Sequence, residues 1–390
     1  MKREELFNLL DKVPTARLQA AAWKATLRLH VWMTGRTHEL MLEFGTRARG
    51  LILKAGGADG VIDATGMYGV QSEMLRTWGD IWSQWQADFQ QARREAAKIA
   101  FGVQAVGHAR LVAPLLVSEG QRSAGSGQLL AESKLTDGVY DPQLRILLNV
   151  AEQYVYGDGV TLDARIWKID RETREDLNLV LMNGIVNKKS AWDLAKEVEQ
   201  FLGAGQDCPR WTSTRLYGRT KSEIASGDVT GLLRGDECDG SGVSYKALRL
   251  ARTEIQKIHA LATDRMMRQQ PWVEQEKINL SAAHPEPDEC DDAAHGGEKG
   301  EGIYPLGTHE LPFHPNCLCY KTAVLMDREQ FVSQMRGWLD GSEPWSAMDT
   351  YASELGVPLD TDLMPAAINL AVWMLDDDFS SIFGARRLGL

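Results

Sequence analysis

Cysteine and histidine residues concentrate in one short stretch of the chain, from His284 to Cys319. These 36 residues hold three of the five cysteines and four of the eight histidines. Zinc in proteins takes four sulfur or nitrogen ligands in a tetrahedron, and short groups of ligands are usually brought together by the chain between them. Two such clusters joined by a glycine-rich loop therefore predict a small structural zinc site.

The first cluster runs from Cys290 to His295, and the second reads His314-x-x-Cys317-x-Cys319. This spacing is not one of the standard zinc-finger patterns. A second interpretation therefore stays open, in which the segment is a cysteine-bearing turn whose thiols are buried as small apolar groups. The residues that could supply zinc ligands are Cys290, His314, Cys317, Cys319, His284 and His295.

Three segments in and around this region carry recognisable motifs. They read ALRLARTEIQKIHALATD at 247–264, LSAAHPEPDECD at 280–291 and PFHPNCLCY at 312–320. In this order they resemble the phage head-morphogenesis proteins of the Mu F-like (MuF) family, which show an RTE helix, an LS-H-D-C segment and a closing HPNC-C motif. The resemblance covers roughly residues 180–340.

The resemblance has consequences for the metal ligands. Many relatives carry C-x-x-C in the first cluster, whereas here Ala293 stands at that offset from Cys290, and Leu318 replaces the usual arginine of the closing motif. His284, Asp288 or His295 would then have to replace the missing thiolate. The expected ligands are Cys290, His314, Cys317 and Cys319, with His284 and His295 as reserves.

The family resemblance also implies a function. It predicts a non-enzymatic minor head (capsid) protein of a tailed bacteriophage, which associates with the portal protein and acts in head assembly and in DNA packaging or ejection. The expected location is the capsid interior near the portal, and the host cytoplasm during assembly. The expected partners are the portal protein, the capsid interior, packaged DNA and further copies of the chain.

Three other kinds of protein compete with this interpretation. A zinc-dependent nucleoside or nucleobase deaminase uses H-x-E followed by P-C-x-x-C, and the chain offers His284-Pro285-Glu286 and the Cys317/Cys319 cluster. The second half, however, reads C-x-C, and Pro287 is poorly placed for the helix start that carries H-x-E.

Another metal-dependent hydrolase would use Asp288, Glu289 or Asp291 as its base. A toxin would need a further catalytic domain, and the residues after Met326 contain no histidine or cysteine.

The composition is that of an ordinary globular protein. The 390 residues are 44% hydrophobic and 25% charged, with a net charge of −11. No apolar run approaches the length of a membrane span, so we expect no membrane contact and a reducing, cytosol-like environment. The negative charge argues against broad coating of nucleic acid. The cationic segment 209–221 is either a solvated loop or a local DNA contact.

Helical periodicity covers most of the chain. Apolar residues at steps of three and four predict helices over 15–54, 67–113, 191–202 and 243–268, and shorter ones over 328–339, 346–355 and 365–375. Trp78, Trp82, Trp85 and Phe89 form one stripe, which suits a core seam or a surface for a partner subunit. KINLSAA (277–283) and CYKTAVL (319–325) read as strands entering and leaving the metal cluster.

These elements predict a mainly α fold with a small α+β module. Long N-terminal helices (1–117) precede a glycine- and serine-rich linker or loop (118–141). A MuF-like domain (142–326) follows, with a short-stranded, zinc-stapled loop region, and then a helical acidic tail (327–390). We expect the 243–268 helix to pack on the metal module. Arg252 and Glu254 are two positions apart and point to different faces of this helix, so they are not expected to pair with each other. The expected role of these residues is a buried or half-buried salt bridge, or a cap on the cluster loop.

Overall fold

The computed structural model describes most of the chain, namely residues 16–56, 60–116, 141–156, 158–202, 243–281, 288–315 and 317–355. Within these ranges the protein is mainly helical and has one small sheet. No helix in the described ranges has the length and apolar character needed to cross a membrane. The predicted fold class, mainly α with a small α+β module, is confirmed at this level.

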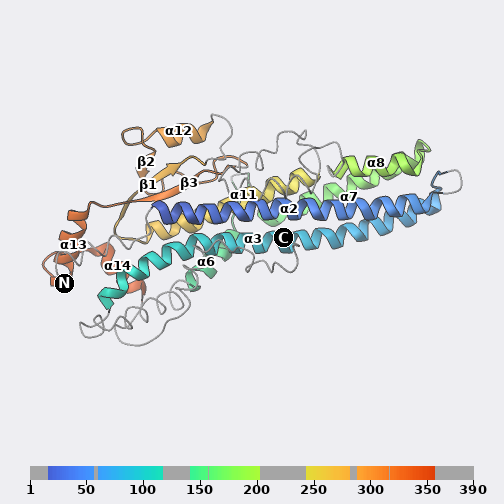
Figure 1. Cartoon of the computed structure of the whole chain (residues 1–390). Coiled ribbons are helices and arrows are strands. Elements are labelled where there is room, and N and C mark those ends of the chain that lie inside the picture. Colours follow the sequence, from blue (N-terminus) through green and yellow to red (C-terminus); the bar gives the residue numbers. More distant parts are fainter. Residues whose placement is uncertain are drawn as a thin grey trace.

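Two long helices, α2 (Ala16–Ala55) and α3 (Ala64–Leu116), run side by side along the molecule (Figure 1). The tryptophan stripe of α3 is buried between helices, with Trp78 and Trp85 fully inaccessible to solvent. Trp85 donates a hydrogen bond from Nε1 to Thr37 Oγ1 of α2 at 2.9 Å, and the ring of Trp78 packs against Phe44. The stripe is therefore a core seam, and its indole groups are unavailable to a partner subunit.

Shorter helices cover this pair. They are α6 (Asp141–Glu152), α7 (Leu162–Val186), α8 (Ala191–Leu202) and α11 (Val243–Arg268). Ser190 caps the start of α8, because its Oγ accepts a hydrogen bond from the backbone N–H of Asp193 at 3.1 Å. Helix α11 packs on both long helices and buries Ala251, Ile255 and Ile258.

A three-stranded antiparallel sheet lies at one end of the helices, in the order β2-β1-β3. Its strands are β1 (Val273–Asn279), β2 (Ile303–Pro305) and β3 (Tyr320–Leu325). A register shift between Val273 and Gln275 puts an extra residue into β1. The extra residue shifts the alternation of buried and exposed side chains along the strand by one position. Val273, Glu276 and Ile278 are therefore all buried, although Val273 and Glu276 are three positions apart.

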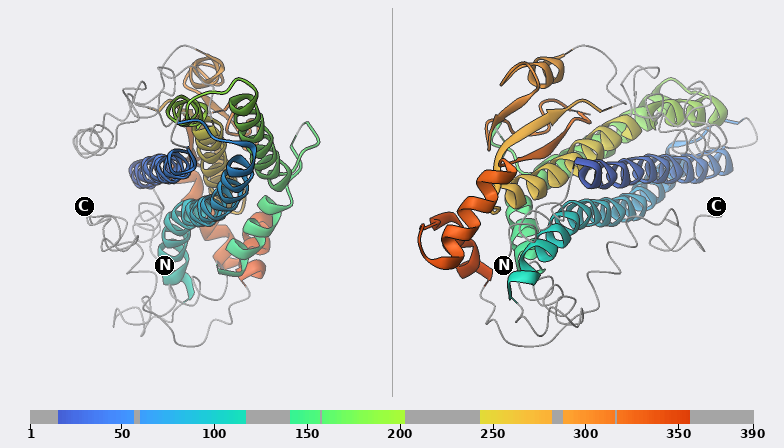
Figure 2. Two further views of the ribbon diagram at one scale, coloured as in Figure 1. Left: turned by 90° about the vertical axis from the view of Figure 1, so that its right-hand side faces the viewer. Right: turned by 60° about the vertical axis from the view of Figure 1, so that its left-hand side comes forward.

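The sheet has helices on both faces. Helices α11 and α2 contact β3, whereas the short helix α12 (Glu289–His295) contacts β1 and lies on the opposite face in the right view of Figure 2. Two further helices, α13 (Arg328–Asp340) and α14 (Ser346–Leu355), follow the sheet. Trp272 lies edge-on against Tyr351 and connects α14 to the core.

The observed elements differ from the sequence-based expectations mainly around the sheet. The long helices and 243–268 appear within a few residues of their expected bounds. The first strand begins at Val273 and ends at Asn279, earlier than the expected 277–283. Strand β2 and helix α12 were not expected. The predicted helix 365–375, residues 118–140 of the predicted linker and the cationic segment 209–221 lie outside the described residues.

The hydrophobic core is continuous across the domain boundaries that the sequence suggested. One cluster of buried side chains includes Leu29 and Trp78 of the long helices, Ile255 of α11 and Phe331 of α13. In the described residues, the N-terminal helices and the region from 142 onward therefore fold around a shared core.

Three histidines are buried in this helical core, and they predict a dependence of stability on pH. Burial lowers the pKa of His30 to about 3 and the pKa values of His38 and His259 to about 4. The unfolded chain takes up protons as the pH falls through 6.5, but the folded chain does not until about pH 4. The free energy of unfolding should therefore be highest above pH 6.5. It should fall between pH 6.5 and pH 4, by roughly 3 kcal/mol per histidine.

Urea unfolding at pH 7, 6 and 5 measures this effect. In a His30→Met variant the fall between pH 7 and pH 5 should be smaller, because one of the groups that titrates only in the unfolded chain has been removed. An unfolding free energy that is unchanged between pH 7 and pH 5 would contradict the assignment.

Candidate metal centre

The first ligand, Cys290, is held at the start of helix α12 by the cap of that helix. Asp288 is the N-cap residue, and its Oδ1 accepts a hydrogen bond from the backbone N–H of Cys290 at 2.7 Å. Asp291 accepts the N–H of Asp288 in return, at 3.0 Å. This reciprocal capping box fixes the backbone of Cys290 and leaves its side chain fully buried.

A tight turn in the connection between β2 and β3 supplies two more ligands. The backbone N–H of Cys317 donates to the carbonyl of His314 at 3.1 Å, which brings the two side chains together. Cys290 Sγ lies 3.3 Å from His314 Nε2 and 3.7 Å from Cys317 Sγ. The potential ligand atoms of these three residues all lie within 4.8 Å of one another.

These spacings match the edges of a zinc tetrahedron. With Zn–S bonds near 2.3 Å and Zn–N bonds near 2.0 Å, neighbouring sulfurs should be about 3.8 Å apart, and a sulfur and a nitrogen about 3.5 Å apart. The observed 3.7 Å and 3.3 Å are close to these values. The arrangement is therefore compatible with a metal ion bound between the three side chains.

Cys319, which directly precedes β3, lies beside this group, although its sulfur is not among the atoms that all lie within 4.8 Å of one another. Its buried side chain packs with Cys290 and Cys317, and with Ala260 and Leu311, in a small core separate from the main one. With Cys319 as the fourth ligand, three sulfurs and one imidazole would form a complete set for a tetrahedral ion. With Cys319 in the group, no other residue has to replace the thiolate that is missing at Ala293.

The three thiols affect one another's ionisation. Interaction with Cys290 is the largest cause of the lowered pKa of Cys317, and interaction with Cys317 is the largest cause of the raised pKa of Cys290. The pKa of Cys319 is also raised, because the effects of Cys317 and of burial outweigh the lowering effect of Cys290. A divalent cation would favour the thiolate form of all three residues.

His314 is oriented by its second ring nitrogen. Nδ1 lies 3.0 Å from the carbonyl oxygen of Pro315, to which only a protonated Nδ1 can donate. Nε2 faces Cys290 Sγ and, at 3.0 Å, Asp288 Oδ2. Both neighbours carry or share negative charge, so the position at Nε2 suits a cation.

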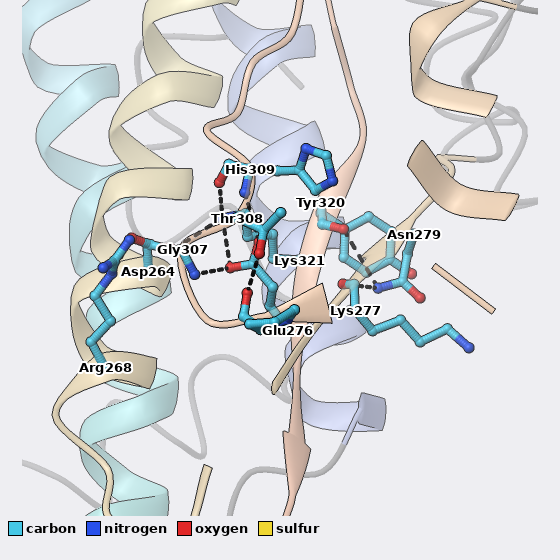
Figure 3. Close-up of polar contacts among 11 residues, drawn as sticks. Asp264, Arg268, Glu276, Lys277, Asn279, Gly307, Thr308, His309, Tyr320 and Lys321 are labelled. Carbon is cyan, nitrogen blue, oxygen red and sulfur yellow. Dashed lines mark hydrogen bonds and ion pairs between the residues drawn. The ribbon is translucent and has the colours of Figure 1, made fainter. Parts of the chain in front are cut away.

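A buried charge network holds the loop that leads to His314 (Figure 3). The carboxylate of Glu276 on β1, fully buried, accepts the backbone N–H groups of Gly307 and His309 at 2.9 and 3.0 Å. Lys321 Nζ on β3 lies 3.0 Å from Glu276 and 3.0 Å from Asp264 of α11, and also donates to the His309 carbonyl. Gly307 has φ +80, and the guanidinium of Arg268 fills the space where a side chain would lie.

Helix α11 also contacts the cysteine cluster directly. Gln256, fully buried, donates from Nε2 to the carbonyl of Cys319. The predicted packing of 243–268 on the module is therefore observed. Arg252 and Glu254 are both buried as expected, but Glu254 faces Tyr156 and Arg93 and does not cap the cluster loop. Gln256 makes the contact that was expected of them.

His295, one of the two reserve ligands, is not part of the cluster. His295 is exposed at the end of α12, and its Nδ1 hydrogen-bonds with the carbonyl of Asp291 at 2.9 Å. His284, together with Glu286 of the deaminase interpretation, lies outside the described residues. Glu276, Lys321 and Gln256 were not among the residues predicted to support the site. No sequence signal distinguishes them, because charged and amide residues on strands and helices are usually exposed.

Comparison of the chain with protein-family models, with curated proteins and with solved structures gave no match.

Proposed function

We propose that this chain is a non-enzymatic minor head protein of a tailed bacteriophage, which acts at the portal within the capsid, and that its cluster binds one structural zinc ion. The observation that supports this most is the meeting of the three motif segments in one module. The helix with the RTE motif contacts the carbonyl of Cys319, and Cys290 of the second segment meets His314 and Cys317 of the third.

The composition of the ligand set favours a structural role for the metal. Catalytic zinc sites keep one position open for water or substrate, whereas structural sites are closed by four protein ligands rich in cysteine. Here three cysteines and one histidine supply four ligands, and the sulfurs of Cys290, Cys317 and Cys319 belong to residues at most 1% exposed. A bound ion would have no free coordination position.

An exposed apolar stripe on α7 supports contacts with partner subunits. Leu179, Met182 and Val186 follow one another at steps of three and four, and they are 60%, 52% and 74% exposed. Large exposed apolar residues on one helix face are typical of protein interfaces. We propose this stripe, in place of the buried tryptophan stripe of α3, as the surface for the portal protein or for a second copy.

Phage particles carrying single substitutions test the proposal. We expect Glu286→Ala particles to assemble and infect normally, because the deaminase interpretation alone requires that residue. Cys317→Ser particles should fail to assemble, because the zinc module cannot form. Loss of a measurable deamination or hydrolysis activity in Glu286→Ala, with assembly intact, would overturn the structural role in favour of an enzyme.

A further inference from the structure

A pocket of about 560 Å³ lies beside the metal centre, between α7, α11 and the segment 310–315. This volume is in the range of small-molecule binding sites. Its lining combines apolar side chains such as Leu250, Leu311 and Phe313 with many charged groups. The segment that carries His314 forms one wall, so the pocket and the metal centre share a structural element.

The charged groups of the lining are predominantly positive. Five cationic side chains face three carboxylates, an excess of two positive charges in a chain whose net charge is −11. Such a local excess favours an anionic ligand. The cations are Arg165, Lys168, Lys246, Arg249 and Lys257, and the carboxylates are Glu172, Glu254 and Glu310.

The pairing of these charges shows where the excess lies. Lys168 and Lys246 share one carboxylate, that of Glu172, at 3.8 and 3.3 Å. Arg165 is already paired with Asp158 at 2.7 Å. Across the described ranges of the chain, neither Arg249 nor Lys257 has a carboxylate within ion-pair distance. These two residues are eight positions apart, on one face of α11.

Aromatic rings hold Lys257 in place without neutralising it. Its Nζ lies 3.2 Å from the ring centroid of Tyr154 and 3.8 Å from that of Tyr156. A cation over aromatic faces keeps its charge and loses side-chain freedom. Burial, the largest influence, lowers the pKa of Lys257 to about 8. The charges of Glu254 and Glu310, which raise this pKa, offset the effect of burial only in part. The ammonium group is therefore pre-positioned and partly desolvated.

We propose that this pocket binds a small organic phosphate monoester of nucleotide size. The negative charge of such a phosphate is complementary to the predominantly cationic lining. Arg249 and Lys257 bind the phosphate, Lys168 and Lys246 add electrostatic attraction, and the apolar part of the ligand packs against Leu250 and Phe313. This ligand goes beyond the proposed role in the phage head and does not depend on it.

Calorimetric titration of the purified, metal-loaded protein with adenosine monophosphate tests the proposal. We expect binding of the monophosphate, a rise in melting temperature with its concentration, and no binding of adenosine. Arg249→Gln and Lys257→Gln should each weaken binding at least about tenfold, because a hydrogen bond to a charged group is lost. Lys257→Arg should retain most of the affinity, since it keeps the charge.

Arg171→Gln is the matched control, because Arg171 also lies over an aromatic ring on α7 but is outside the lining of the pocket. Its affinity should equal that of the unmodified protein. The proposal is overturned if the monophosphate does not bind at millimolar concentration, or if Arg249→Gln and Lys257→Gln bind it normally. It is also overturned if a DNA oligonucleotide binds in a Lys257-dependent manner while the monophosphate does not, since the surface would then contact nucleic acid.

Discussion

Chelation of the metal should lower the melting temperature of the protein and make Cys290, Cys317 and Cys319 reactive toward thiol reagents. The freshly purified protein should contain about one zinc ion per chain by elemental analysis. The effect should be among the largest of any single perturbation, because the free energy of binding a structural zinc contributes directly to folding, roughly 10–16 kcal/mol in zinc-finger peptides. The three thiols are at most 1% exposed in the folded protein, so their reactivity reports loss of the module.

Two variants separate the metal centre from its surroundings. Cys317→Ser should contain no zinc and should melt at a lower temperature that the chelator does not change. His295→Ala is the matched control, because His295 is an exposed histidine close in sequence to Cys290, and its ring hydrogen-bonds with the carbonyl of Asp291. It should keep its metal. Absence of metal from fresh protein, together with normal melting of Cys317→Ser, would show that the site does not exist.

Substitution of Lys321 by methionine should cost about 3–5 kcal/mol of stability, because it leaves the buried carboxylate of Glu276 without its cation. Lys321 has a side chain only 2% exposed, and that of Glu276 is 0% exposed. Urea unfolding measures the loss. The same variant should also bind zinc more weakly, since Glu276 and Lys321 together hold the loop that precedes His314.

Arg268→Met provides the comparison for Lys321→Met. Arg268 pairs with the same Asp264 at 2.8 Å, but its side chain is 51% exposed. An exposed pair of this kind contributes at most about 1 kcal/mol, so this variant should unfold almost like the unmodified protein. Equal unfolding free energies for Lys321→Met and Arg268→Met would refute the proposed role of the buried network.

The helices of the long bundle could be predicted because each carries a sustained periodic pattern and ends at a recognisable stop. Strand β2 has three residues and α12 has seven, which is too short for periodicity to show. For α12 a local signal was available, since Asp288 and Asp291 have the spacing of a capping box. The first strand was misplaced because the bulge after Val273 breaks the alternation of buried and exposed residues.

For the candidate metal site as well, some features could be predicted from the sequence and others could not. Cysteine and histidine are rare residue types, so their density between His284 and Cys319 is visible in the sequence, and the His314–Cys317 turn is local. The sequence by itself therefore determined the ligand candidates and the helical class of the fold. Only the tertiary structure decided that Cys290 joins that turn and His295 does not, because this depends on the orientation of α12 across the sheet. It also decided that Glu276 and Lys321 are buried together, since their pairing across two strands brings together residues that are 45 positions apart.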